Sequence, residues 1–255
     1  MDRIHRITDD VFLVRGTAVN WILLREGRDL TLVDAGYPRD LGLLLASVEQ
    51  LGHRIEDLRG VLITHAHVDH IGALPELLRR HPAPVYAHPD EVALLRGEKH
   101  EQASTWDVVS RSWRPRFARW ALTVARAGAR THVRIPEAVP FPGPGPLDLP
   151  GRPSPVPCPG HTSGHTAYEL ADAGTVLTGD ALITAHPLSG HSGPQLLPAF
   201  FTHDTRASLA ALDALRGLGA DTVVPGHGPV WRGPVAKAVD AARAHAPQGY
   251  RGRQR

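Results

Sequence analysis

Four potential metal ligands lie within six residues of the sequence. His65, His67, Asp69 and His70 follow the short apolar segment 61–64 and precede a helical pattern. On a regular strand His65 and His67 would share one face, but a turn at the strand end can direct all four side chains around two centres. Imidazole and carboxylate groups are the ligands that borderline divalent ions such as zinc prefer. The spacing therefore predicts a metal site after this strand.

Three further ligand-type residues occur in comparable places along the chain. His161 lies in a loop before an expected strand, Asp180 follows the expected strand 175–178, and His227 follows the expected strand 222–224. Each has a glycine beside it, and glycine lets the backbone turn sharply. Loops that carry ligands at strand ends are how a site is assembled on a rigid sheet. We expect the seven side chains to converge, because such a cluster of histidines and carboxylates is costly without a metal.

Hydrophobic periodicity and turn residues predict the elements that position these side chains. Apolar residues at helical spacing predict a helix over 41–51 that ends at Gly52, and leucines predict another over 74–78. The proline-rich segment 141–159 is expected to be mostly loop. The remaining expected elements are strands over 11–14, 21–24, 30–34, 61–64, 85–87, 167–170, 175–178 and 222–224, and helices over 205–216 and 235–245.

The segment 96–134 differs from the rest of the chain and is predicted to be a helical, lid-like insertion. A capping-box-like start at 104–107 opens one helix, while Pro115 and Gly128 fit the first turn and the end of a second. Nine basic and three acidic residues indicate either a solvated helical face or the steering of an anionic substrate. One apolar stripe crosses both helices and either packs on the domain, covers the site or forms a homodimer surface. Its residues are Trp106, Val109, Trp113, Phe117, Trp120 and Val124.

The composition is that of a globular protein, with 255 residues of which 42% are hydrophobic and 21% charged. We expect one domain over residues 1–255, ending in a flexible basic tail at about 248–255. The formal charge of +2 does not demand a nucleic-acid partner, and the single Cys158 excludes an internal disulfide framework. We expect Cys158 to be a small buried hydrophobe. No apolar run suits a membrane span and no apolar signal core is present, so we expect a cytoplasmic protein without a membrane partner.

Asp34, the motif His65-x-His67-x-Asp69-His70, His161, Asp180 and His227 occur in this order over nearly the whole chain. In these motifs the chain resembles the metallo-β-lactamase-fold hydrolase superfamily. The resemblance implies an α/β fold, a four-layer αββα sandwich, that holds two divalent metal ions, zinc first, with iron or manganese as alternatives. His65, His67 and His161 would bind the first metal. Asp69, His70 and His227 would bind the second. Asp180 would bridge both together with a water or hydroxide, and Asp34 would hydrogen-bond to the ligand loop.

The reaction that the resemblance implies is metal-assisted hydrolysis of a small-molecule substrate. A bridging hydroxide would attack the carbonyl of an ester, lactone or thioester, and Asp69 or Asp180 would pass the proton to the leaving group. One alternative is a phosphodiesterase, for nucleic acid or another substrate, that uses the same two metals. A metal-binding protein without turnover is disfavoured because no expected ligand is missing.

Differences from the motifs of individual branches reduce the number of branches of the superfamily that the chain resembles. β-Lactamases carry Cys or Ser where this chain has Asp180, which argues against that activity. Acyl-homoserine lactonases place a Tyr where this chain has Ile183, so a lactonase would lack that oxyanion donor. Glyoxalase II enzymes add a C-terminal helical domain, which we expect to be absent because 28 residues follow His227. A stand-alone hydrolase of the lactonase, thioesterase and glyoxalase-like group remains.

The other histidines are assigned from their places in the sequence. His165 and His88 either line the site or are structural. The segment after Asp180 holds candidates for contact with the substrate, namely His186, His191 and His203. The rest are expected at surface or core positions, namely His5, His53, His81, His100, His132 and His245.

Overall fold

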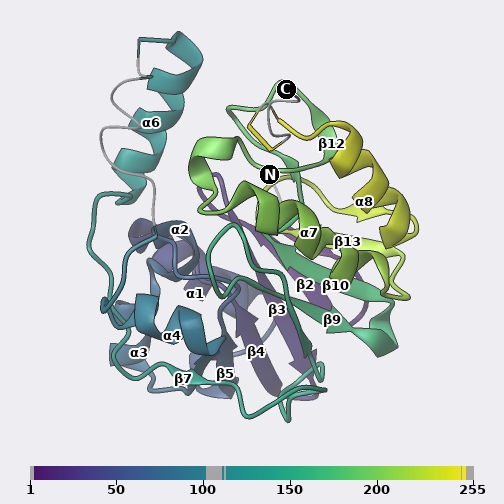
Figure 1. Ribbon diagram of the computed structural model, residues 1–255. Helices are drawn as coiled ribbons and strands as arrows, with labels where there is room; N and C mark the ends of the chain where they lie inside the picture. Colours follow the sequence, from purple (N-terminus) through teal and green to yellow (C-terminus); the bar gives the residue numbers. More distant parts are fainter. Residues whose placement is uncertain (1–2, 102–110, 112, 248, 251–255) are drawn as a thin grey trace. The chain divides into compact units, whose positions relative to one another are not determined.

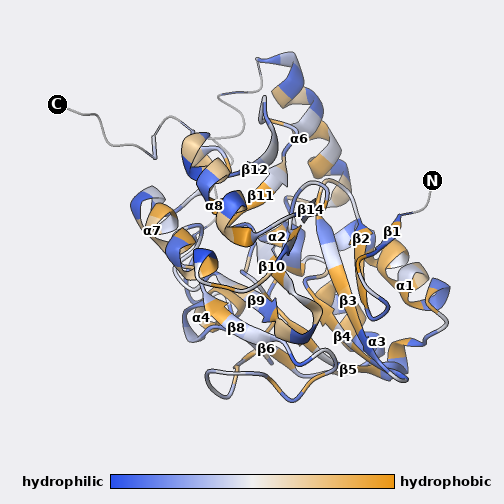
Figure 2. Cartoon of the chain, turned by 90° about the vertical axis from the view of Figure 1, so that its right-hand side faces the viewer, coloured by the Kyte–Doolittle hydropathy of each residue, from blue (hydrophilic) through white to orange (hydrophobic). Residues whose placement is uncertain are grey.

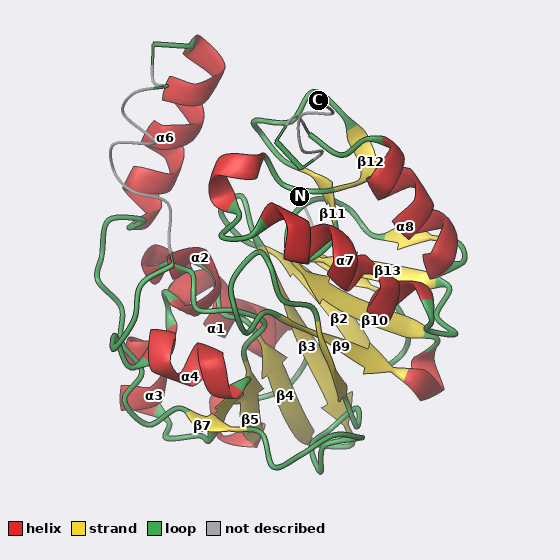
Figure 3. Ribbon diagram, viewed as in Figure 1, coloured by secondary structure: helices red, strands yellow, loops and turns green. Residues whose placement is uncertain are grey.

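The computed structural model describes residues 3–101, 111, 113–247 and 249–250. The chain divides into two compact units, Met1–His100 with Val124–Ser154 and Glu101–Thr123 with Pro155–Arg255. Each unit combines strands and helices (Figures 1 and 3), which confirms the expected α/β class. No helix of the described part is long and apolar enough to cross a membrane.

The first unit is built on a seven-stranded sheet whose strands follow one another in chain order. The first four strands pair antiparallel, and the last three continue the sheet in parallel with the fourth. Parallel neighbours need crossover connections, and helices supply them here. The strands are β1 (Ile4–Arg6), β2 (Val11–Arg15), β3 (Asn20–Glu26), β4 (Asp29–Val33), β5 (Leu58–Leu62), β6 (Val85–Ala87) and β7 (Val139–Pro140).

Helices of the first unit connect its parallel strands. They include α1 (Leu41–Gln50), α2 (Val68–Ile71), α3 (Leu74–Arg80) and α4 (Pro89–Leu95). Leu44 and Val48 of α1 lie in the same buried cluster as Val61 of β5 and Leu74 of α3. Gly52, with φ of +78°, follows α1 in the left-handed conformation expected after a helix end. The core therefore fixes where β4 and β5 end, and the ligand loop begins at one of these ends.

The second unit is built on a five-stranded sheet in the order β14-β13-β10-β9-β8, with a separate pair β11-β12. β10 and β13 pair in parallel. α7 (Thr205–Arg216) and α8 (Val235–Ala244) contribute Leu212, Leu215, Ala238 and Val239 to the buried cluster of this unit. The strands are β8 (Ser154–Pro157), β9 (Thr166–Leu170), β10 (Thr175–Gly179), β11 (Ile183–Ala185), β12 (Ser192–Gln195), β13 (Thr222–Pro225) and β14 (Trp231–Arg232).

The predicted insertion contains helix α6 (Pro115–Ala127), which begins at Pro115 and is followed by Gly128 at φ of +100°, as expected. Figure 2 shows hydrophilic and hydrophobic residues side by side along this helix. Phe117 and Val124 of the predicted stripe are buried. Trp113, which precedes the first turn of α6, is 76% exposed, so at this residue the stripe does not pack on the described part of the chain. The predicted start at 104–107, Trp106 and Val109 lie outside the described residues, as does most of the predicted tail.

Several short elements were not predicted. The segment 141–159, expected to be mostly loop, contains β8. Helix α4 and strands β1, β11, β12 and β14 also had no counterpart among the expected elements. β12 has the sequence Ser-Gly-Pro-Gln, which carries none of the β-branched or aromatic residues that signal a strand. Its pairing with β11 is decided by tertiary structure.

Candidate metal centre

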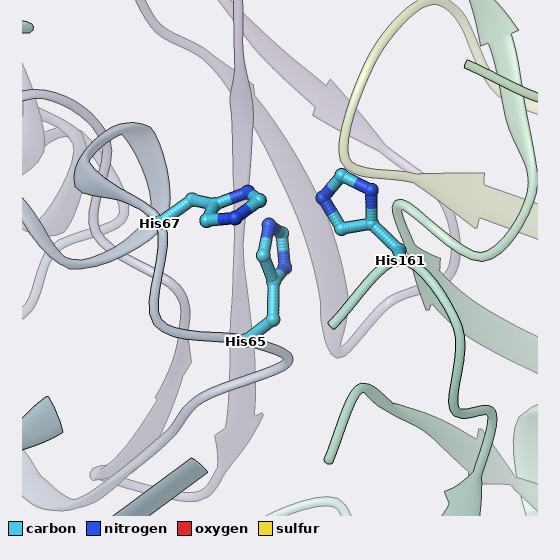
Figure 4. A group of neighbouring side chains, drawn as sticks. All are labelled: His65, His67 and His161. Carbon is cyan, nitrogen blue, oxygen red and sulfur yellow. The ribbon is translucent and has the colours of Figure 1, made fainter. Parts of the chain in front are cut away.

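Three imidazoles meet on the loop that leaves β5. The rings of His65 and His67 are 4.6 Å apart between centroids, and those of His65 and His70 are 4.0 Å apart. His65 and His70 are fully buried and His67 nearly so. Figure 4 shows His65 and His67 on this loop, drawn together with His161. Imidazolium ions this close would repel one another, so neutral rings that offer lone pairs to a cation suit the cluster.

Asp34 holds this loop from the end of β4. Its carboxylate accepts hydrogen bonds from the Thr64 backbone N–H at 2.9 Å and the Thr64 hydroxyl at 2.7 Å. The Nδ1 atom of His70 lies 2.7 Å from Asp34 Oδ2. A proton on Nδ1 leaves the lone pair of neutral His70 on Nε2, the atom that a metal would use. Asp34 therefore orients the loop, as expected from the sequence.

Glu91 is a second carboxylate beneath the loop, and sequence reasoning missed it. Its side chain is fully buried on α4, and its Oε2 accepts the Ala66 backbone N–H at 2.7 Å. Ala66 lies between the two histidines of the motif. A buried Glu among apolar helix positions is a signal that could have been found if α4 had been predicted. His88 has a structural part here, because its Nδ1 accepts the Asp90 backbone N–H at the start of α4.

The second unit brings His161, Asp180 and His227 together. Asp180 follows β10 directly, and His227 lies two residues after β13. Gly160 and Gly179 have φ of +133° and +48°, so the expected sharp turns beside the ligands are confirmed. A Cβ atom at Gly160 would lie 2.1 Å from the backbone nitrogen of Ser208, so no larger residue fits there.

One carboxylate oxygen lies between two imidazoles in this unit. Asp180 Oδ2 is 3.5 Å from His161 Nε2 and 3.3 Å from His227 Nε2. Two ligand atoms on one tetrahedral zinc ion, each about 2.0–2.1 Å from the metal, are about 3.4 Å apart. Each of the two distances thus fits a pair of ligands on one divalent ion.

His165 and His186 are positioned around this trio. The fully buried His165 accepts the backbone N–H of Asp180 on Nε2 at 3.0 Å, which fixes the strand end. The His186 ring lies 5.4 Å from the His227 ring, and its Nδ1 accepts the Leu188 backbone N–H at 3.1 Å. Burial, followed by the neighbouring His227, lowers the pKa of His186 to about 3. The imidazole of His186 is therefore neutral.

Two other histidines from the same segment have different surroundings. His191 stacks on His245, with ring centroids 4.2 Å apart. His203 is exposed, and its backbone N–H donates to the His161 carbonyl. Cys158 is buried, and burial raises its pKa to about 12. The prediction of a small buried hydrophobe at Cys158 is confirmed.

The donor set fits divalent metal ions. The first unit supplies His65, His67, Asp69 and His70, and the second supplies His161, Asp180 and His227; all seven belong to candidate metal-binding groups. Five imidazoles, which are borderline donors, and two carboxylates, which are hard donors, together suit zinc, iron or manganese. The chemistry of these residues therefore agrees with the metal site predicted from their spacing.

Comparisons with known proteins agree with this chemistry. The sequence profile described as "Metallo-beta-lactamase superfamily" matches residues 14–227. The chain is similar to "Probable metallo-hydrolase YflN" of Bacillus subtilis (strain 168), with 30% identity over 80% of this chain and 76% of that protein. A stretch covering 31% of this chain is 36% identical to "Ribonuclease J 1" of Streptococcus pyogenes, but it spans 15% of the nuclease.

A solved structure supports the fold. A metallo-beta-lactamase family protein from Thermus thermophilus superimposes with a TM-score of 0.65 and 24% identity, covering 94% of this chain and 80% of that one. This similarity shows the fold that the sequence predicted.

Proposed function

This chain belongs to the metallo-beta-lactamase superfamily of metallo-hydrolases, and we propose that it hydrolyses an ester, lactone or thioester with two metal ions. The observation that carries the proposal is the place of Asp180 Oδ2, at 3.5 Å from His161 Nε2 and 3.3 Å from His227 Nε2. The family match runs through residues of both units. We therefore propose that the two units act as one metallo-hydrolase domain.

The seven donors are divided between two metals in this proposal. His65, His67 and His161, the residues drawn in Figure 4, hold the first metal. Asp69, His70 and His227 hold the second. Asp180 is shared by both. The Nδ1 contact of His70 with Asp34 supports the use of Nε2 as the ligand atom. Zinc is the first candidate, and iron and manganese are the alternatives.

The proposed reaction needs two metal ions and a group that transfers a proton. Two divalent ions would lower the pKa of water to about 7 and would polarise the substrate carbonyl. Asp69 and Asp180 differ in exposure, because the side chain of Asp69 is 18% exposed and that of Asp180 is 3% exposed. A group that hands a proton to a leaving group must reach it. We therefore assign this transfer to Asp69 and the positioning of the metals to Asp180.

An aromatic wall in the second unit supports an acyl substrate. The wall consists of Phe117, Trp120, Phe200 and Phe201, with Trp120 and Phe201 rings 5.5 Å apart. His186 joins it to His227, since its ring lies 5.9 Å from Trp120 and 5.4 Å from His227. Apolar walls beside a reacting group favour apolar acyl chains.

Two arginines of the second unit, one of them in contact with this wall, favour an anionic group on the substrate. The Arg111 guanidinium lies 4.7 Å from the centroid of the Phe200 ring. Arg116 donates to the Ser189 carbonyl and is exposed. Guanidinium groups recognise carboxylate and phosphate groups by paired hydrogen bonds. The proposed substrate is therefore a small acyl compound that carries a negative charge.

The proposal is tested by metal analysis and a substrate panel on zinc-loaded protein. The panel contains p-nitrophenyl acetate and butyrate, a γ-lactone, an acyl thioester, nitrocefin and bis(p-nitrophenyl) phosphate. We expect two equivalents of zinc per chain, because seven donors exceed what one tetrahedral site uses, and turnover of the carboxylic substrates. One equivalent or none after reconstitution contradicts the dinuclear site. Turnover confined to the phosphodiester contradicts the substrate class and favours the phosphodiesterase alternative.

A further inference from the structure

The imidazole of His186 stands between the aromatic wall and a proposed metal ligand. It directly follows β11, and its side chain is 8% exposed. Its ring makes edge contacts with Phe201 and His227, each at 5.4 Å between centroids, and lies 5.9 Å from Trp120. These contacts hold the ring in one place beside the site. A phenylalanine would fill the same space, so the imidazole nitrogens call for an explanation.

The hydrogen bond at Nδ1 fixes which nitrogen carries the proton. The Leu188 backbone N–H donates to Nδ1 at 3.1 Å, and only a lone pair can accept that bond. A neutral ring then carries its single proton on Nε2. With its Nδ1 lone pair used, the ring is a hydrogen-bond donor and is not arranged as a metal ligand or a base.

We propose that the Nε2–H group of His186 donates a hydrogen bond to the substrate oxygen that becomes negative during hydrolysis. The inference rests on the proposed hydrolase function. When the oxygen of water bonds to the carbonyl carbon, the water gives one proton to the Asp69 carboxylate, the π electrons of the carbonyl move onto its oxygen, and His186 stabilises that oxyanion. When the C=O bond re-forms, the bond to the leaving group breaks and the leaving group takes a proton from Asp69. His186 keeps its own proton throughout.

A fixed donor in a buried site is well suited to this role. A donor that is already oriented needs no reorganisation as charge develops, and a surrounding of low polarity strengthens the hydrogen bond. The backbone N–H of Leu188 orients the donor, and Phe201 and Trp120 shield it. Contact with His227 places His186 beside the second proposed metal, where the scissile carbonyl would bind.

Three substitutions separate donation from packing. His186→Phe keeps an aromatic ring without a donor, and His186→Asn reaches only the Nδ1 position. His186→Gln extends an amide N–H to the place of Nε2. With p-nitrophenyl butyrate and zinc-loaded protein, we expect kcat to fall roughly 10²–10³-fold in the Phe and Asn variants, the loss seen when one oxyanion donor is removed. KM should change little. The kcat of the Gln variant should be at least about tenfold higher than that of the Phe variant.

Two further measurements distinguish transition-state stabilisation from a structural role. A methylphosphonate monoester, which resembles the tetrahedral state, should bind His186→Phe more weakly, while butyrate should bind it as it binds the wild type. Zinc content and melting temperature should match those of the wild type. His5→Asn is the control, because His5 is exposed and is not among the histidines expected to contact the substrate.

Each remaining outcome overturns a stated part of the inference. An active wild type with an equally active His186→Phe variant overturns donation by His186 and leaves the hydrolase function standing. A Gln variant as slow as the Phe variant, loss of zinc, or loss of folding in all three variants makes the role of His186 structural. A zinc-loaded wild type that hydrolyses no carboxylic substrate overturns the proposed function, and this inference with it.

Discussion

The Nδ1 atom of His70 lies 2.7 Å from Oδ2 of Asp34, and both side chains are buried. Asp34 adopts φ of +60°, a left-handed conformation that costs a non-glycine residue about 1 kcal/mol or more. In this conformation its carboxylate also accepts two hydrogen bonds from Thr64. The strained backbone is therefore compensated by contacts that organise the ligand loop.

Substitution of Asp34 by alanine should weaken metal binding without removing a ligand. Loss of the carboxylate frees His70 to change its tautomer and ring orientation, and such outer partners change metal affinity by about 10–100-fold. Competition of zinc with a chromogenic chelator measures the effect. Asp172→Ala is the control, because Asp172 is exposed in the second unit. Wild-type zinc affinity in Asp34→Ala would show that the carboxylate does not orient His70.

Substitution of Asp180 by alanine should abolish turnover and leave the fold intact. Asp180 is the one proposed ligand shared by both metals, and its backbone N–H keeps its partner in His165 because the substitution alters the side chain alone. Kinetics with the best panel substrate and a thermal melt are the two measurements. A variant that hydrolyses this substrate at nearly the wild-type rate would refute the bridging role.

Glu91→Ala should destabilise the first unit. It removes the acceptor of the Ala66 backbone N–H, and a polar group left without its partner inside a protein costs about 1–3 kcal/mol. Glu91→Gln keeps an acceptor oxygen and should recover most of the free energy of unfolding. Urea denaturation of both variants measures this, with the exposed Asp90→Asn as the control. Equal stability of the Ala variant and the wild type contradicts the anchoring role of Glu91.

Four of the seven proposed ligands could be grouped from the sequence because their spacing is local, whereas the residues that support them come from distant segments. His65, His67, Asp69 and His70 form one motif, so their grouping could be predicted without a fold. Glu91 is 25 residues from its partner Ala66, and only the packing of α4 brings the two together. The contact of Trp120 with His186 likewise joins residues far apart in sequence.

Helical periodicity also has a limit that Trp113 illustrates. Periodicity says which residues share a face of a helix, but not how far along the helix a neighbour covers that face. Phe117 meets Phe200, whereas Trp113 lies before Pro115 and is exposed. Packing on the domain therefore holds for Phe117 and not for Trp113, and a role of the stripe as a lid or homodimer surface stays a prediction.

The Cys158 thiol should be unreactive in the folded protein. Burial raises its pKa to about 12 from 9.0, so almost no thiolate forms at pH 8, and thiolate is the form that reacts. Because the pKa of the thiol is higher in the folded than in the unfolded protein, keeping the thiol protonated stabilises the fold. This stabilisation is complete below pH 9 and is lost as the pH rises towards 12. Labelling with iodoacetamide at pH 8 should require urea. Rapid labelling of the native protein would contradict the burial of Cys158.

The last prediction concerns the aromatic wall. One tryptophan of α6 lies in this wall, and a second tryptophan, just before α6, is exposed. Trp120 contacts Phe117, Phe201 and His186, whereas Trp113 is 76% exposed. Trp120→Leu should lower the free energy of unfolding by roughly 1–2 kcal/mol, because aromatic pairs contribute about 0.5–1.5 kcal/mol each beyond area burial. It should also lower kcat/KM for p-nitrophenyl butyrate more than for the acetate, because the longer chain reaches the wall.

Trp113→Leu is the matched control for this prediction. The same change of residue type at the exposed position should leave stability, zinc content and the butyrate-to-acetate ratio of kcat/KM as in the wild type. If Trp120→Leu loses stability but keeps that ratio, the wall packs α6 onto its unit and does not meet the acyl chain. If Trp113→Leu shifts the ratio as much as Trp120→Leu does, the exposed Trp113 recognises the acyl chain as well, and the aromatic wall alone does not select it.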